Sequence, residues 1–213
     1  SSAASDVYKR QPQHRIEAIT AENKDNYPID FIGALAYDSI NNGMWIGANQ
    51  GLFFYDLKHK QLCSPFANRA AEDIRGCIGS IIDKNGQLWI GCLDGVYIID
   101  LHSRPASSSD GVFRYRHLKY KLDDPSSGLI EKICCFYEAQ DGILWLGSNG
   151  YGIYKCMQDE RGEVQFICYN SLHGLPDNSI RGILEDDKGY IWIATNNCLL
   201  YTSDAADERS SVD

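Results

Sequence analysis

The sequence lacks any run of 18 consecutive apolar residues, which is about the length that a helix needs to cross a bilayer. It also shows no charged start followed by an apolar run, so no signal peptide is expected in it. Positive charge is scarce, because 20 Lys and Arg residues stand against 29 Asp and Glu residues and give a net charge of −9. Phosphate binding needs clustered Lys and Arg, so we expect no nucleic-acid partner, and we expect no membrane contact from this segment.

Motifs of known enzyme and metal sites are missing as well. The sequence contains no G-x-S-x-G, no H-E-x-x-H and no phosphate-binding P-loop. We therefore expect no catalytic residue, no metal and no cofactor. The five histidines stand apart from any paired Ser or Cys and are interpreted as solvated surface residues: His14, His59, His102, His117 and His173.

The eight cysteines include no C-x-x-C pair and have no histidine at zinc-finger spacing. Most of them are interpreted as small buried apolar residues, while one or two disulfides stay open as an alternative. Cys134 and Cys135 are neighbours on an expected strand, so their side chains are expected on opposite faces. The other cysteines are Cys63, Cys77, Cys92, Cys156, Cys168 and Cys198.

Long segments of helical periodicity are missing too, and the nearest candidate is the short segment at 67–76. What the sequence has instead is one phrase written four times: "NNGMWIG", "KNGQLWIG", "DGILWLG" and "KGYIWIA". Each copy holds one tryptophan, and the intervals between Trp45, Trp89, Trp145 and Trp192 are 44, 56 and 47 residues. Periods of this size are typical of propeller blades and other repeat arrays.

Each copy of the phrase stands inside the same series of short strands and tight turns. A β-rich run comes first, and a turn then places Gly86, Gly142 or Gly189 three residues before the tryptophan. The first copy has Asn42 at that place, and Asn also tolerates positive φ. A second turn follows the Trp strand, and a third strand and in two copies a fourth come after it. The expected strands other than the Trp strands are 31–37, 77–83, 132–138 and 179–185, then 52–57, 96–101 and 153–157, then 113–120 and 164–170.

This series predicts an all-β fold built from four-stranded antiparallel meanders. A single meander cannot bury both of its faces, and radial stacking of copies solves this in a β-propeller. The indole rings then have a structural role, because each large flat ring packs between neighbouring blades. The structural residues predicted for the repeat are Trp45, Trp89, Trp145, Trp192, Gly47, Gly86, Gly91, Gly142, Gly147 and Gly189.

Both ends of the chain differ in character from the repeats. Residues 1–11 and 199–213 resemble translated sequencing-adaptor sequence of the kind found in metagenomic fragments, or else ordinary disordered tails. We therefore expect a partial β-propeller over residues 12–198, with about three blades and parts of the flanking blades. Such an arc is expected to be open, with two unpaired sheet edges.

The fourth copy carries a resemblance to a known family. The segment "HGLPDNSIRGILEDDKGYIWIATNN" at 173–197 resembles the two-component regulator propeller repeat, and "IGSIIDKNGQLWIGCLDGVYIID" at 78–100 is similar to the central part of that repeat. The likeness is looser in the first and third copies. Ala194 and Cys198 depart from it, because the repeat has Gly at both places.

The resemblance implies a partial arc of a seven-bladed propeller. It also implies the periplasmic sensor region of a hybrid two-component histidine kinase from Bacteroidetes, which recognises glycan fragments and controls polysaccharide-utilisation genes. The resemblance also implies that the full-length receptor is a homodimer. Two alternatives stay open: a propeller scaffold for protein partners without small-molecule sensing and, less favoured, a propeller lyase, although no catalytic set supports an enzyme.

A binding face is expected where the second turns and the blade-to-blade loops gather at one end of the propeller. Amide and carboxylate side chains there can hydrogen-bond sugar hydroxyls, and an aromatic ring can stack on a sugar. The alternative is that these residues serve the turns themselves. The candidate residues for binding an oligosaccharide are Asn49, Gln50, Asp94, Asn149, Tyr151, Asp177, Asn178 and Asn196, with the loop at 123–127 beside them.

Overall fold

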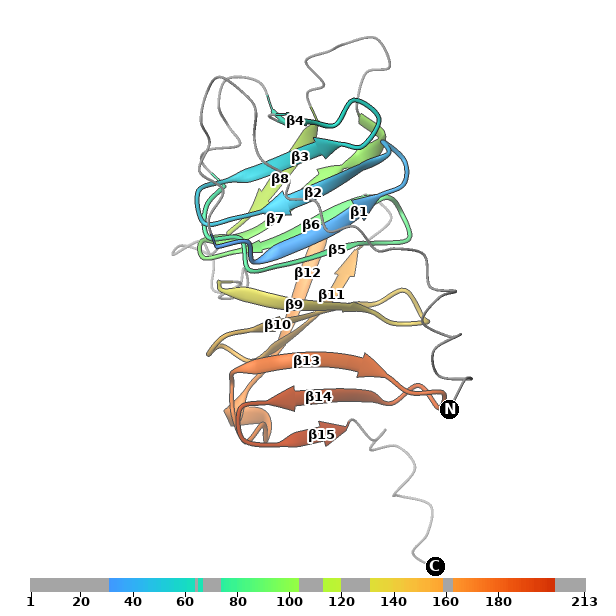
Figure 1. Ribbon diagram of the computed structural model, residues 1–213. Coiled ribbons are helices and arrows are strands. Elements are labelled where there is room, and N and C mark those ends of the chain that lie inside the picture. Colours follow the sequence, from blue (N-terminus) through green and yellow to red (C-terminus); the bar gives the residue numbers. More distant parts are fainter. Residues whose placement is uncertain are drawn as a thin grey trace, which may run out of the picture.

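The computed structural model describes residues 31–63, 65–66, 74–103, 113–119, 131–158 and 163–201. These residues form four antiparallel sheets and two single turns of 3-10 helix, η2 (Leu101–Ser103) and η4 (Ser171–His173) (Figure 1). The prediction of an all-β fold is confirmed. Within this described part, no helix is long and apolar enough to cross a membrane.

Each sheet follows the chain as a meander, so neighbouring strands in the sheet are neighbours in sequence. The first blade contains β1 (Ala34–Asp38), β2 (Gly43–Gly47), β3 (Leu52–Asp56) and β4 (Gln61–Cys63). The second contains β5 (Gly79–Ile82), β6 (Gln87–Cys92), β7 (Gly95–Asp100) and β8 (Arg114–Leu118). The third contains β9 (Ile133–Glu138), β10 (Leu144–Ser148), β11 (Ile153–Gln158) and β12 (Val164–Tyr169). The fourth contains β13 (Ile180–Glu185), β14 (Ile191–Thr195) and β15 (Leu199–Tyr201).

The predicted four-stranded antiparallel meander is therefore confirmed in the first three blades. Strand β4 was not predicted, because its three residues contain a single buried apolar side chain and no turn signal marks its end. Strand β15 begins at Leu199, so the fourth blade extends three residues past the predicted boundary at 198. Of the predicted tails at 1–11 and 199–213 and the helix candidate at 67–76, residues 1–11, 202–213 and 67–73 lie outside the described residues.

The turn before each Trp strand contains one residue in the left-handed region. The φ angles are 51° at Asn42, 71° at Gly86 and 84° at both Gly142 and Gly189. Glycine adopts such angles without steric cost and Asn adopts them more easily than other residues, so the turn chemistry explains this residue choice.

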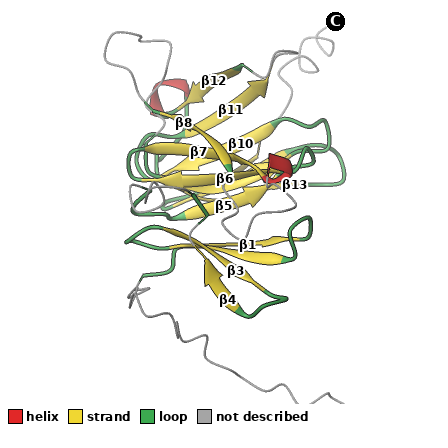
Figure 2. Ribbon diagram, turned by 90° about the horizontal axis from the view of Figure 1, so that it is seen from above, coloured by secondary structure: helices red, strands yellow, loops and turns green. Residues whose placement is uncertain are grey.

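The four sheets are stacked side by side in chain order along an open arc (Figures 1 and 2). The first strand of each blade lies against the first strand of the next, in the order β1, β5, β9 and β13. Each blade therefore covers one face of the blade before it, which is the arrangement of propeller blades around an axis.

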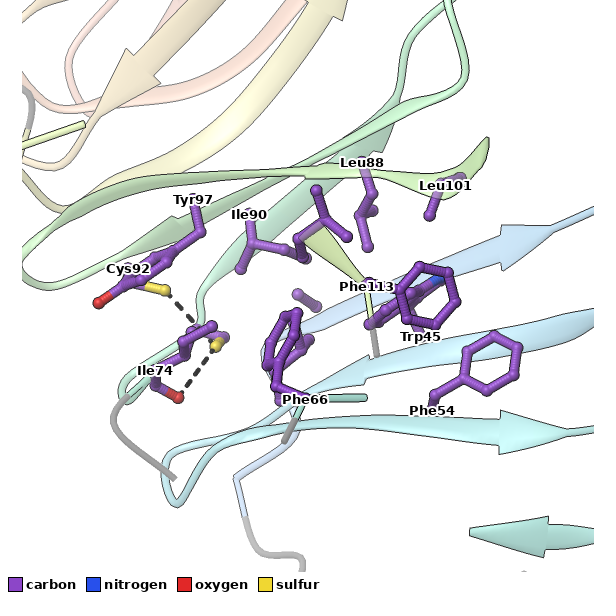
Figure 3. Packing of buried hydrophobic residues seen from close by; sticks show 14 residues of the cluster. Trp45, Phe54, Phe66, Ile74, Leu88, Ile90, Cys92, Tyr97, Leu101 and Phe113 are labelled. Atoms are coloured by element: carbon purple, nitrogen blue, oxygen red, sulfur yellow. Dashed lines mark hydrogen bonds between the residues drawn. The ribbon is translucent and has the colours of Figure 1, made fainter. Parts of the chain in front are cut away.

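Three of the four tryptophans lie at the interfaces between blades. Trp45 is completely buried and packs between Phe54 of its own blade and Phe113, which precedes β8 of the second blade (Figure 3). The ring centroids of Trp45 and Phe113 are 4.9 Å apart in an edge-to-face arrangement. Trp89 packs against Leu146 of the third blade in the same way, and Trp145 packs against the fourth blade.

A buried carboxylate at the end of the first strand fixes both the turn and the indole. In the second blade, one oxygen of Asp83 accepts the backbone N–H groups of Asn85 and Gln87, and its other oxygen accepts the indole N–H of Trp89 at 2.9 Å. Asp38 and Asp186 bind Trp45 and Trp192 at 3.0 and 2.8 Å. The motif was not predicted from the sequence, although an Asp stands six or seven residues before three of the four tryptophans.

The third blade departs from this motif. Ala139 stands six residues before Trp145, where the second and fourth blades have Asp. No described residue gives the Trp145 indole N–H a hydrogen-bond acceptor, although the side chain is only 9% exposed. The turn is held instead by Asp141, which accepts the backbone N–H of Ile143 at 2.9 Å.

Polar contacts connect successive blades beside these motifs. Glu138 of the third blade accepts the backbone N–H of Lys84 at 3.0 Å, and Glu185 of the fourth accepts that of Gln140 at 2.8 Å. The final residue of a first strand thus binds the turn of the preceding blade. The same two structural positions are thus joined at two of the three interfaces between blades.

Glycine two residues after the tryptophan, within the Trp strand, allows the blades to approach one another. A Cβ on Gly91 would stand 2.0 Å from the carbonyl oxygen of Ile133 in the third blade. A Cβ on Gly147 would meet the side chains of Cys135 and Ile180 at 2.4 and 2.6 Å. Only glycine fits where a strand of one blade faces the first strand of the next.

We predict that Asp83→Ala lowers the free energy of unfolding by about 3 kcal/mol, because the buried indole N–H of Trp89 and two turn N–H groups lose their acceptor. Urea unfolding followed by tryptophan fluorescence measures the change. The control is Asp141→Ala, which removes one exposed turn bond and is expected to cost less than about 1 kcal/mol. Equal losses in the two variants would contradict the structural role given to Asp83.

A second prediction concerns the contact between blades. Gly91→Ala is expected to destabilise the chain by about 2–3 kcal/mol, because the new methyl group collides with backbone that cannot move independently. Gly182→Ala is the matched control, since the nearest atom to its Cβ is 4.0 Å away, and its effect is expected within about 0.5 kcal/mol. Thermal unfolding of both variants tests this, and a neutral Gly91→Ala would contradict the described packing.

Candidate functional site

The second turns and the blade-to-blade loops meet at one end of the blades, as an antiparallel meander requires. In three of the four blades, the fourth residue after the tryptophan is asparagine: Asn49, Asn149 and Asn196. The second blade has Leu93 at that place, and its side chain is 52% exposed. The repeat therefore presents a series of polar turns along one edge of the arc.

Five of the predicted ligand residues come together between the third and fourth blades. Asn149 pairs with Ser179 in an isolated antiparallel bridge, and the backbone N–H of Asn196 donates to the carbonyl of Ser179 at 3.2 Å. The carbonyl of Asn178 accepts the N–H groups of two glycines that flank Tyr151, at 3.2 and 2.8 Å. Asp177, the fifth, precedes Asn178 in the same loop.

Several of these side chains are occupied by the loops themselves. The carboxylate of Asp177 accepts the N–H of Ser179 at 2.7 Å and the side-chain amide of Asn197 at 2.9 Å. Asn178 accepts the N–H of Ser171 at 2.7 Å. Asn196 accepts the guanidinium N–H of Arg181 at 2.6 Å. These three residues therefore position the loops, as the turn interpretation of them expects.

Asn149 and Tyr151 remain the side chains best placed to contact a ligand. The side-chain amide of Asn149 is exposed and has no partner among the described residues. Tyr151 is half-buried, and the ammonium group of Lys132 lies 5.8 Å from the centroid of its ring. The structure thus combines an exposed amide, an aromatic face and a cation within one loop cluster.

The sequence did not predict Lys132 or Arg181 as parts of this cluster. Arg181 lies at a register shift between Ile180 and Gly182 on β13, which leaves it without a partner residue on β14 and turns it toward Asn196. Lys132 has a positive φ of 52° just before β9. Neither feature has a signal in the sequence, since both depend on the backbone path at the start of a first strand.

The remaining predicted ligand residues lie in the turns of the first two blades. Asn49 is exposed, and its carbonyl accepts the N–H of Gly76 at 3.2 Å, while Gln50 is half-buried. Asp94 accepts the hydroxyl proton of Tyr97 at 3.2 Å. No described contact connects these residues to the cluster of the third and fourth blades, and the predicted loop at 123–127 lies outside the described residues.

His117 departs from the prediction of a solvated surface histidine. Its ring stacks on Tyr97 with centroids 3.9 Å apart, and its Nε2 lies 3.5 Å from the carboxylate of Asp94. Burial lowers the pKa of His117, while the charge of Asp94 opposes this effect. The stacked pair supports the second turn of the second blade. Among the described residues, no three His, Cys, Asp or Glu side chains gather to hold a metal ion.

A cleft of about 540 Å³ runs between the third and fourth blades, along Trp145, Lys155 and Tyr169. The ammonium group of Lys155 lies 5.8 Å from the ring centroid of Trp145. At the interface of the first two blades, the corresponding space beside Trp45 is filled by Phe113 at the start of the fourth strand. The cleft lies beside Trp145 where Phe113 lies beside Trp45, and we do not assign it to a ligand.

Residues 174–197 match the family model described as "Two component regulator propeller". The chain contains a two component regulator propeller repeat. The matched residues begin in the loop before β13 and end in the turn before β15, so they cover the fourth copy of the phrase. No curated protein matches the chain in sequence.

Solved structures resemble the chain in fold. PorZ from Porphyromonas gingivalis, a bacterial surface component of the type-IX secretion system, has a TM-score of 0.56 at 18% identity, over 88% of this chain and 28% of that one. The WD40 beta propeller domain of Doa1 has a TM-score of 0.51 at 12% identity, over 82% of this chain and 52% of that domain. The fold is that of β-propeller blades.

The extracellular domain of BT4673 from B. thetaiotaomicron, described as a hybrid two component system, is 18% identical. Its TM-score is 0.46, over 84% of this chain and 28% of that one. The chain thus spans less than a third of the length of this domain.

Proposed function

We propose that this chain is part of the ligand-sensing, extracytoplasmic propeller region of a two-component signalling receptor. The observation that carries the proposal is the match of residues 174–197 to the regulator propeller repeat. The matched residues include Asp177, Asn178 and Asn196, which build one side of the loop cluster. The repeat therefore supplies both the family likeness and the scaffold of the candidate site.

The chemistry of the loop cluster suits an oligosaccharide. The amide of Asn149 can donate to and accept from sugar hydroxyls, and the face of Tyr151 can stack on a pyranose ring. Lys132 and Arg181 add donors beside it. Because the loops are fixed by their own hydrogen bonds, little ordering is needed when a ligand binds, which favours affinity.

The signalling role requires parts beyond this segment. In the proposed receptor, binding at the propeller changes the arrangement of a homodimer, and a histidine kinase region then controls genes for polysaccharide use. A periplasmic location belongs to the same proposal, with Bacteroidetes as the source of such receptors. The repeat match and the exposed amide of Asn149 beside Tyr151 support the proposal.

The test is saturation-transfer NMR of the 213-residue chain with a panel of di- to hexasaccharides, followed by calorimetry of each one that binds. We expect Tyr151→Ala and Asn149→Ala to weaken binding at least about tenfold, which corresponds to about 1.4 kcal/mol. The control is Asp187→Ala, an exposed residue at the opposite end of the fourth blade, which is expected to leave the affinity unchanged.

Two outcomes would contradict the proposal. If the folded chain binds no oligosaccharide and instead captures a protein through the same loops, it is a scaffold. If an oligosaccharide binds equally well to the wild type and to both loop variants, the site lies elsewhere on the molecule.

A further inference from the structure

Two buried thiols face each other in the second blade. The Sγ atoms of Cys77 and Cys92 are 3.5 Å apart, and the two residues are 2% and 0% exposed. Cys77 lies just before β5, and Cys92 ends β6, the Trp strand of the same blade. Figure 3 shows Cys92 inside the apolar cluster beside Tyr97 and Ile74.

Other residue types stand at the corresponding positions of the third and fourth blades. Cys92 directly follows Gly91, as Ser148 follows Gly147 in the third blade. In the third and fourth blades, the corresponding partners across the two strands are Ile133 with Ser148 and Ile180 with Thr195. In the second blade, Cys77 stands two residues before Gly79, as Ile133 stands two residues before Cys135, so the corresponding positions hold two cysteines.

Cys134, Cys135 and Cys156 are less well placed to form a disulfide. Cys134 and Cys135 were expected on opposite faces, but β9 shifts register opposite Gly147 and Ser148, and Cys134 is left without a partner residue. Its thiol donates to the carbonyl of Ile180 at 3.3 Å, and Cys135 also packs toward the fourth blade. A disulfide between adjacent residues would have to distort the peptide bond that joins them. Cys156 is buried in the cluster between the second and third blades, and burial raises its pKa to about 12.

We propose that Cys77 and Cys92 are joined by a disulfide when the protein matures in the presence of a disulfide oxidant. One thiolate attacks the oxidant and forms a mixed disulfide, and the second thiolate then displaces the bound half. Two cysteine thiols lose two electrons and two protons in total, and one oxidant disulfide becomes two thiols. The sulfurs need to approach by about 1.5 Å to reach bonding distance, and rotation of the two side chains can supply much of this.

The position of the bond suggests its effect. Cys77 follows Gly76, whose N–H binds the carbonyl of Asn49, and Cys92 precedes the turn that contains Asp94. The disulfide would hold the loop that enters the second blade against the second turn of that blade. Oxidation is expected before the core closes, because Cys92 is buried and its thiol pKa is raised by the neighbouring Cys77 and by burial.

The chain allows a direct test by peptide mapping. The 213-residue protein is refolded with oxidised and reduced glutathione, its free thiols are alkylated, and it is digested with trypsin without reduction. Cleavage after Lys84 separates Cys77, in the peptide 76–84, from Cys92, in the peptide that begins at residue 85. We expect mass spectrometry to find these two peptides linked.

Stability supplies the second measurement. Reduction of the oxidised protein is expected to lower its Tm by about 5 °C or more, because the bond closes a loop of roughly 15 residues. Cys92→Ala should abolish the linked peptide and the effect of reduction, whereas Cys156→Ala, which removes another buried cysteine, should retain both.

The inference is overturned if the folded wild-type protein keeps Cys77 and Cys92 alkylated as free thiols after refolding, or if either one is linked to a different cysteine. It does not depend on any ligand, so failure to bind an oligosaccharide leaves it unaffected.

Discussion

The hydrogen bond between a tryptophan indole and a buried carboxylate organises this structure. In three of the four blades, one Asp side chain accepts the backbone N–H groups of the first turn and the indole N–H of the following strand. A charged group is costly to bury unless every acceptor oxygen is used, and here both oxygens are used. The indole is thereby held at one angle, and its ring becomes the surface on which the next blade packs. In the exposed fourth blade, the indole N–H of Trp192 keeps the pKa of Asp186 below its usual value.

Stacking of the blades follows from this fixed ring and from glycine. The ring of Trp45 or Trp89 fills the broad part of an interface, while Gly91 and Gly147 allow the first strands to approach near the axis. The loops at the end of the blades that holds the candidate site are positioned by these contacts, because each one begins or ends at a strand that faces another blade. A carbohydrate site between blades would then be sensitive to the packing beneath it.

The spacing of the tryptophans and the turn residues could predict much of the fold, because strands joined by tight turns depend on residues that are close to one another in the sequence. The meander and its strand order need only that local information. The sequence could not show that the side chains of Asp177 and Asn178 hydrogen-bond within their own loop. Asn and Asp are common both in turns and in binding sites, so the residue type alone does not distinguish the two roles. The register shifts that place Arg181 and Cys134 were also hidden, because no turn residue or break in the pattern marks them within β13 and β9. Ala139 interrupts the carboxylate motif without changing the pattern of strands, and Trp145 still packs against Ile180 and Ile191 of the fourth blade.

Proton exchange of the four indole N–H groups, followed by NMR on protein labelled with ¹⁵N-tryptophan, tests the central role of the carboxylate most directly. The indole protons of Trp45 and Trp89 are buried and bonded to Asp38 and Asp83, so they should exchange at least about 100-fold more slowly than that of Trp145. The result that contradicts the account is a Trp145 proton protected as strongly as those of Trp45 and Trp89, or rapid exchange at all four positions.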